Sequence, residues 1–260
     1  MRALKLHHVA DGPAAAPALV LSSSLGTTLE MWEPQVAPLA ERFRVVRYDR
    51  RGHGRSPVAA GATTIDDLGG DLVELLDELA LERISFCGLS LGGVEGMWLA
   101  VNAPERVERL ALCCTAASFA PRQDWVDRAA TVRADGVDAI ADAVLGRWFR
   151  SSFRDTHPDV VARFREMLVS TPAEGYAACC DALADADLTS RLGEIAAPTL
   201  VLTGADDPVA PPATGDALAA AIPDAAHTVV EGAAHIANVE QPDAFTAALL
   251  RHLGGDKGDA

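Results

Sequence analysis

The sequence predicts an α/β fold in which helices cover both faces of a mostly parallel sheet and a helical cap is inserted into the sheet domain. Short apolar runs typical of buried strands alternate with segments of helical periodicity. Strand signals vanish over residues 121–192 and resume at Pro198. We therefore expect a core formed by residues 1–120 and 193–253, a cap formed by residues 121–192, and a frayed polar tail at 254–260.

The individual elements follow in order along the chain. The runs predicted as buried strands are 18–21, 45–48, 84–87, 110–114, 199–202 and 228–230. A helix is predicted over 65–79, because leucines keep helical spacing there and Thr64 with Asp67 resembles a capping box. Another helix follows the strand at 84–87, and a last one covers 242–253. Breaks between the cap helices are expected at Gly136, Gly146, Pro158, Pro172 and Gly175.

Composition and charge limit the classes of partner. The chain has 260 residues, with 22 Lys and Arg against 37 Asp and Glu, and a formal net charge of -15. Nucleic-acid binding and adsorption to anionic membranes rely on clustered cations, so neither partner is expected. The opening segment lacks an apolar run of signal-peptide length and no stretch is long enough to span a bilayer, which predicts a cytoplasmic location.

The five cysteines are predicted to be buried thiols and not ligands. Two adjacent pairs, at 113–114 and 179–180, lack the C-x-x-C spacing that lets both sulfurs reach one metal ion, and an odd total does not suit a disulfide framework. No metal or other cofactor is expected.

Residues 88–92 read Gly-Leu-Ser-Leu-Gly, between the predicted strand 84–87 and the helix that follows it. This is the nucleophile elbow of serine hydrolases with the α/β-hydrolase fold, in which glycines on either side leave room for a tight turn that projects the serine. Ser90 is therefore the predicted nucleophile.

A serine hydroxyl needs a base, and the base needs an acid to orient it. His235 follows the last predicted strand, as the chain order Ser, acid, His of this architecture requires. His227 suits a surface position better, and His53 suits a structural loop near the site. For the acid, Asp207 is preferred to the adjacent Asp206, because a glycine followed three residues later by aspartate, with Pro211 closing the loop, is the usual pattern of acid loops in this fold.

Two backbone amides are needed to bind the oxyanion of the tetrahedral intermediate. The Leu91 amide, directly after the nucleophile, is one predicted donor. The early loop, where residues 22–28 read Ser-Ser-Ser-Leu-Gly-Thr-Thr, supplies the other, and by position it is the Leu25 amide. The serines could instead serve only to satisfy backbone groups in a turn, which is compatible with that assignment.

Several segments resemble 3-oxoadipate enol-lactonases. The segment 24–27, Ser-Leu-Gly-Thr, ahead of Met31 and Trp32 is similar to the start of that family, as are the cap segments 147–149 and 171–180 and the closing segment 234–240. The resemblance extends to about residue 253. The chain departs from the family pattern at Ser23, where asparagine is common, and at Arg50, where a small hydroxyl residue is common.

The resemblance implies hydrolysis of 3-oxoadipate enol-lactone, in protocatechuate or catechol degradation, through an acyl-enzyme and without a cofactor. The substrate is an anionic lactone, so a local cation is expected in the cap. The candidate substrate-binding residues are Arg128, Arg147, Trp125 and Trp148. The alternative for the two arginines is that each lies on a solvated helix face. The alternatives for the function are another esterase, a perhydrolase, a C–C bond hydrolase and, from a different class, a non-catalytic ligand receptor.

Overall fold

The computed structural model describes residues 4–59, 61–119 and 121–254. Within them the chain forms one sheet with the strand order β1-β3-β2-β4-β5-β6-β7. The strands are β1 (His8–Asp11), β2 (Ala18–Ser22), β3 (Arg44–Tyr48), β4 (Ile84–Leu89), β5 (Val107–Cys113), β6 (Thr199–Gly204) and β7 (Ala225–Val230). Only β1 pairs antiparallel with its neighbour, and the other pairings are parallel. The predicted fold class, a mostly parallel sheet with flanking helices, is confirmed.

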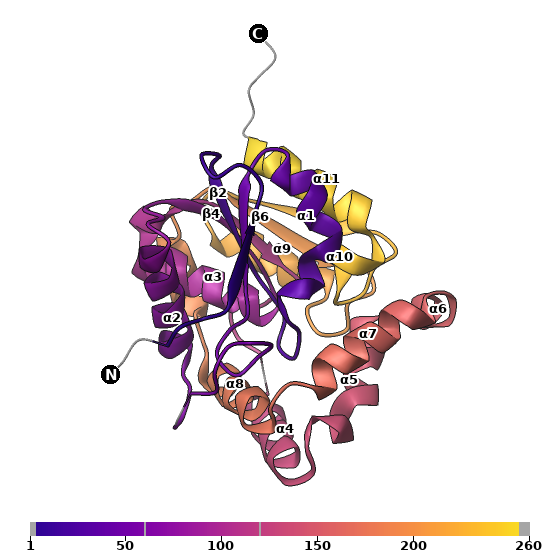
Figure 1. Cartoon of the computed structure of the whole chain (residues 1–260). Coiled ribbons are helices and arrows are strands. Elements are labelled where there is room, and N and C mark those ends of the chain that lie inside the picture. Colours follow the sequence, from indigo (N-terminus) through magenta and orange to yellow (C-terminus); the bar gives the residue numbers. More distant parts are fainter. Residues whose placement is uncertain (1–3, 60, 120, 255–260) are drawn as a thin grey trace.

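Helices cover both faces of this sheet (Figure 1). The core helices are α1 (Glu33–Ala40), α2 (Ile65–Glu78), α3 (Leu91–Asn102), α9 (Pro212–Ala221), α10 (Ala237–Glu240) and α11 (Pro242–Gly254), with short 3-10 helices at Leu29–Trp32, Pro104–Arg106 and Thr189–Glu194. α1 packs against α11 on one side, and α2 packs against α3 on the other. The strands between them are almost fully buried, which explains why they read as continuous apolar runs.

A group of helices between β5 and β6 lies at one end of the sheet (Figure 1). It comprises α4 (Arg122–Asp135), the 3-10 helix Val137–Ile140, α5 (Ala141–Trp148), α6 (Ser151–Thr156), α7 (Pro158–Val169) and α8 (Ala173–Asp185). Its position is that of the expected cap, and we use the word cap for residues 122–185. None of the helices in the described part of the chain is long and apolar enough to cross a membrane. Residues 255–260 of the expected tail lie outside the described residues.

The capping box predicted for α2 is present. The Thr64 hydroxyl accepts the Asp67 amide, while the Asp67 carboxylate accepts the Thr64 amide at 2.9 Å. All five cysteines are free and buried, as predicted.

Three local expectations were wrong. β1 was missed because it is a short, half-buried strand at the edge of the sheet, without an apolar run. Gly146 lies inside α5, where buried Val144 and Trp148 anchor the helix and outweigh the roughly 1 kcal/mol that an internal glycine costs. Gly175 lies inside α8, where a Cβ would come 2.2 Å from the Gly52 carbonyl oxygen, so this glycine serves close packing.

Candidate active site

Ser90 lies at the sharp turn between β4 and α3. Its backbone has φ 59° and ψ -117°, a conformation that residues other than glycine rarely adopt. The turn is fixed on both sides, because the Ser90 amide donates to the Cys113 carbonyl at 2.9 Å and the Thr115 hydroxyl donates to the Ser90 carbonyl at 2.7 Å. Such a turn directs the side chain away from the sheet and toward the end of the strands.

The two glycines of the motif are required by close approach. A Cβ at Gly88 would lie 2.0 Å from the Gly92 carbonyl oxygen, and a Cβ at Gly92 would lie 2.3 Å from the Ser22 carbonyl oxygen. Backbone atoms cannot move out of the way as a side chain can. The tight turn that carries Ser90 therefore requires glycine at both position 88 and position 92.

His235 and Asp207 come from the loops that follow β7 and β6 and form a buried pair. His235 Nδ1 lies 2.9 Å from Asp207 Oδ2, and their side chains are 3% and 0% exposed. The other carboxylate oxygen of Asp207 accepts the amides of Val209 and Ala210 at 2.8 and 3.2 Å. Burial acts to raise the pKa of Asp207, but the charge and hydrogen bonding of His235, with these amides, outweigh it, and the pKa is lowered. An ionised Asp207 can fix the imidazole with Nδ1 as the donor, which leaves Nε2 as the base.

The other candidates for acid and base are placed elsewhere. The Asp206 side chain is exposed, and its nearest cation is Arg150, at 3.9 Å. His227 on β7 uses both ring nitrogens, at 2.8 Å from Asp216 and at 2.8 Å from the Thr203 hydroxyl. The structure therefore brings Asp207, and not Asp206, together with His235.

The loop after β2 borders the site. Ser24 and Leu25 line the same cavity as Ser90 and His235, and Leu91 is the first residue of α3. Within the described residues, no hydrogen-bond acceptor is found for the amide of Leu25 or of Leu91. Both amides are therefore free to donate to an oxyanion. The next amide along, that of Gly26, donates to His53 Nε2 at 3.0 Å, so His53 supports this loop from inside the protein.

Arg50, one of the two departures from the family pattern, is buried behind that loop and does not reach the cavity. Its Nε lies 3.1 Å from Glu95 Oε1 on α3, and its terminal nitrogen donates to the Ser23 carbonyl at 2.5 Å. The Tyr48 hydroxyl also donates to Glu95, at 2.7 Å. This network links the loop of Leu25 to the helix of Leu91. Sequence reasoning noted Arg50 but missed Glu95, whose place inside an apolar helix was the available signal.

A cavity of about 450 Å³ opens above Ser90, between the sheet and the cap. Its walls combine apolar side chains with a few polar ones, which is typical of a small-molecule site. All four substrate-binding candidates line it, Trp125 and Arg128 from α4 and Arg147 and Trp148 from α5. Phe119 and Tyr176 also line it and were missed as single residues, although Tyr176 belongs to a segment singled out for its family resemblance. Asp124 and Asp127 lie at the same wall.

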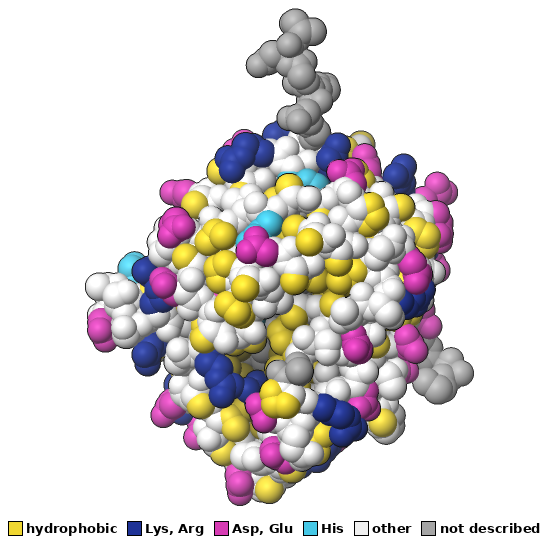
Figure 2. Space-filling model, turned by 180° about the vertical axis from the view of Figure 1, so that it is seen from behind, with side chains coloured by type: hydrophobic (Ala, Val, Ile, Leu, Met, Phe, Trp, Pro, Cys, Tyr) yellow, Lys and Arg dark blue, Asp and Glu magenta, His cyan; other side chains and the backbone are white. Residues whose placement is uncertain are grey.

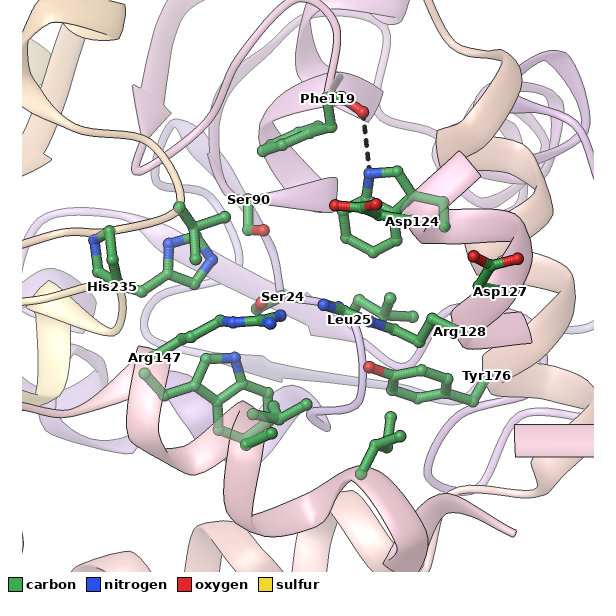
Figure 3. A pocket seen from close by; sticks show the side chains of 17 residues that line it. Ser24, Leu25, Ser90, Phe119, Asp124, Asp127, Arg128, Arg147, Tyr176 and His235 are labelled. Carbon is green, nitrogen blue, oxygen red and sulfur yellow. Dashed lines mark hydrogen bonds between the residues drawn. The ribbon is translucent and has the colours of Figure 1, made fainter. Parts of the chain in front are cut away.

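The two arginines point into the cavity from opposite sides (Figure 3). Among the described residues, neither Arg128 nor Arg147 forms an ion pair with a carboxylate within 4.0 Å. The guanidinium carbon of Arg128 lies over the Trp125 ring, 4.6 Å from the ring centroid. Arg128 is half-buried, whereas Arg147 is exposed. These two guanidinium groups, which face each other across the cavity near Ser90, provide a place where an anion can bind.

The outer surface does not show the same concentration of charge. On the face seen in Figure 2, acidic and basic side chains are dispersed, and hydrophobic side chains gather around a hollow near the middle. Within the described residues, no group of three or more His, Cys, Asp or Glu side chains is arranged to hold a metal ion.

Comparisons with known proteins agree with this geometry. The family model described as "alpha/beta hydrolase fold" matches residues 17–242. The chain is 43% identical over 244 residues to 3-oxoadipate enol-lactonase 2 of Acinetobacter baylyi, covering 94% of this chain and 91% of that protein. It is 39% identical to 3-oxoadipate enol-lactonase 1 of the same organism, covering 90% and 88%. The crystal structure of the enol-lactonase from Burkholderia xenovorans LB400 superimposes with a TM-score of 0.95 at 45% identity, covering 97% of this chain and 98% of that one. The resemblance inferred from the sequence is confirmed.

Proposed function

Because this chain belongs to the α/β-hydrolase family, we propose that it is a serine lactonase that hydrolyses 3-oxoadipate enol-lactone to 3-oxoadipate during the degradation of aromatic compounds. The observation that carries the proposal is the cavity above Ser90, which is lined by His235 and by two arginines that form no ion pair with any described carboxylate. The similarity to enol-lactonases supports the same reading. Ser90, His235 and Asp207 are assigned as nucleophile, general base and orienting acid.

Acylation follows from this arrangement. Ser90 Oγ attacks the ring carbonyl while His235 Nε2 takes the hydroxyl proton, and the amides of Leu25 and Leu91 hold the oxyanion. Asp207 stabilises the imidazolium that forms. When the tetrahedral intermediate collapses, the bond between the carbonyl carbon and the ring oxygen breaks, and His235 returns the proton to the departing enol oxygen. The ring is then open, and the acid part is esterified to Ser90.

Deacylation repeats these steps with water as the nucleophile. The enol formed by ring opening tautomerises to a ketone, which disfavours closure of the ring. His235 takes a proton from water, the hydroxide attacks the acyl carbon, and the second tetrahedral intermediate releases 3-oxoadipate while His235 reprotonates Ser90. Each proton removed by His235 is given back, so the cycle needs no cofactor.

The carboxylate of the lactone is assigned to Arg128, with Arg147 as the second cation. An anion that enters a protein of net charge -15 needs a local cation. Arg128 takes precedence because it is half-buried, so water screens its charge less than that of exposed Arg147. The Trp125 ring holds the guanidinium over its face and limits its freedom.

The first test is the turnover of enol-lactone beside that of a neutral short-chain aryl ester, for the wild type and for Ser90→Ala. We expect a large preference for the lactone, and loss of nearly all turnover of both substrates in a folded Ser90→Ala variant. Near wild-type turnover by the variant would overturn the role of Ser90. A preference for the aryl ester would instead indicate an esterase.

The second test separates carboxylate binding from hydrolysis. Arg128→Ala should weaken transition-state binding of the anionic lactone by about 2 kcal/mol, the lower end of the range for a buried charge pair, because the site is only half-buried. Turnover of the neutral ester should change little. Arg133→Ala is the matched control, because Arg133 lies on the same helix but pairs with Glu174 and Asp181. If Arg128→Ala and Arg147→Ala each lowered turnover of both substrates by the same factor, these arginines would not bind the substrate carboxylate.

A further inference from the structure

A short segment of the cap is linked to the backbone on both sides of His235, directly on one side and through the Glu240 side chain on the other. Trp148 ends α5, and Arg150 precedes α6. The Trp148 carbonyl accepts the amide of Ile236 at 3.1 Å. On the other side of the histidine, the amide of Ala234 donates to Glu240 Oε2 at 2.5 Å, and the amide of Arg150 donates to Glu240 Oε1 at 3.1 Å. The residue after His235 is therefore bonded directly to the cap, and the residue before it is linked to the cap through Glu240.

The link before His235 is the buried carboxylate of Glu240, which accepts hydrogen bonds from two backbone amides and from the Arg150 side chain. The Glu240 side chain is 0% exposed, and Arg150 Nε lies 3.4 Å from its Oε1, in addition to the two amides. A buried carboxylate is tolerated only when donors and a counter-charge compensate for the lost water. Glu240 meets that condition only because the cap supplies Arg150.

Arg150 also reaches the loop that carries the orienting acid. Its terminal nitrogen lies 3.9 Å from Asp206, the residue before Asp207, and the Asp206 amide donates to the Ala233 carbonyl at 2.9 Å. The arginine thus stands where the acid loop, the histidine loop and the cap meet. Neither Arg150 nor Glu240 lines the cavity above Ser90.

We propose that Arg150 and Glu240 are positioning residues, which fix the backbone of His235 to the cap so that cap and histidine keep one arrangement. The proposal rests on the role assigned to His235 above. Trp148 lines the cavity and also accepts the Ile236 amide, so a substrate that contacts Trp148 touches the segment that holds the base. The cap therefore contributes to the hydrolysis of every ester that Ser90 attacks, whether or not the ester carries a carboxylate.

This role predicts a particular kinetic pattern. A displacement of about 1 Å in a reacting group can cost about 100-fold in rate, so a loosened histidine lowers kcat without removing a substrate contact. We expect Arg150→Ala to lower kcat by about 10-fold or more on the enol-lactone and by the same factor on a neutral aryl ester, with KM unchanged on both. Arg128→Ala gives the opposite pattern, because it affects the lactone alone.

The experiment compares Arg150→Ala, Arg150→Lys and Glu240→Gln, with Arg165→Ala as the matched control. Arg165 pairs with Asp138 at 2.6 Å within the cap, and among the described residues it has no hydrogen bond or ion pair with the loop of His235. In Arg150→Ala, Glu240 still accepts two backbone amides but loses its counter-charge, so circular dichroism and thermal unfolding check that the variant is folded before kcat is compared. Arg150→Lys keeps a cation at this position and should retain most of the wild-type kcat. Glu240→Gln places an amide group against a backbone N–H and should lower kcat as Arg150→Ala does.

Loss of kcat on both substrates in Arg150→Ala, recovery in Arg150→Lys and wild-type rates in Arg165→Ala would support the proposal. Wild-type kcat in Arg150→Ala, a change in KM alone, or the same loss in the Arg165 control would overturn it. The aryl ester also keeps this test separate from the proposed function. A wild type that hydrolyses the ester but not the lactone would contradict the substrate assignment and leave the comparison of kcat values intact.

Discussion

His53 should make the stability of this protein depend on pH in a way that one substitution removes. The imidazole is completely buried, donates from Nδ1 to the Arg51 carbonyl at 3.2 Å, and accepts the Gly26 amide at Nε2. Burial, with the charge of nearby Arg50, lowers the pKa of His53 from 6.5 to about 3. The folded protein therefore keeps the imidazole neutral at pH values where an unfolded chain protonates it.

The size of the effect follows from the two pKa values. Because the folded pKa is the lower one, the unfolded state binds more protons between the two values, and stability falls as the pH drops below 6.5. Each pH unit in that interval costs about 1.4 kcal/mol, so this single group removes about 2 kcal/mol from the free energy of unfolding between about pH 8 and about pH 5. The stability is fully present above the unfolded pKa.

Urea denaturation of the wild type and of His53→Gln at those two pH values would measure the contribution. Glutamine retains an acceptor for the Gly26 amide but does not titrate, so the variant should lose about 2 kcal/mol less than the wild type on acidification. Other titrating groups are common to both proteins and cancel in the comparison. Equal losses in the two proteins would refute a buried, neutral His53 and the reasoning that links it to the loop of Leu25.

Three further outcomes are expected. Asp207→Asn should lower kcat by up to about 10⁴-fold, whereas Asp206→Asn should have a small effect, and the reverse order in a steady-state assay would reassign the orienting acid. Activity should fall on acidification, because a general base loses its function when protonated while Asp207, with its lowered pKa, stays ionised; a rate that stayed level to about pH 4 would contradict a histidine base. Gly92→Ala should destabilise the fold by about 3 kcal/mol or more through the clash with the Ser22 carbonyl, measured by thermal unfolding, and a stable, active variant would disprove that constraint.

The regular part of the fold could be predicted because buried strands and half-buried helices each have a characteristic pattern of apolar residues in the sequence. Strands covered on both faces read as apolar runs, and α2 carried both a one-sided apolar stripe and its capping box. β1 lies at the edge of the sheet and is only half-buried, so no apolar run marked it. The helix α8 runs through Gly175 because packing against Gly52 outweighs local propensity, and local propensity is all that a linear reading can use.

The sequence by itself determined the motif around Ser90, because the turn there permits only glycine at two fixed positions, and it indicated the order of acid and histidine along the chain. The spacing from Gly204 already favoured Asp207 over Asp206, and the tertiary structure places Asp207 against His235 and leaves Asp206 exposed. It also decided that Arg128 and Arg147 face one cavity while Arg150 reaches Glu240. Contacts between residues 90 positions apart leave no periodic signal, because they form only when the cap folds back over the carboxyl ends of the strands.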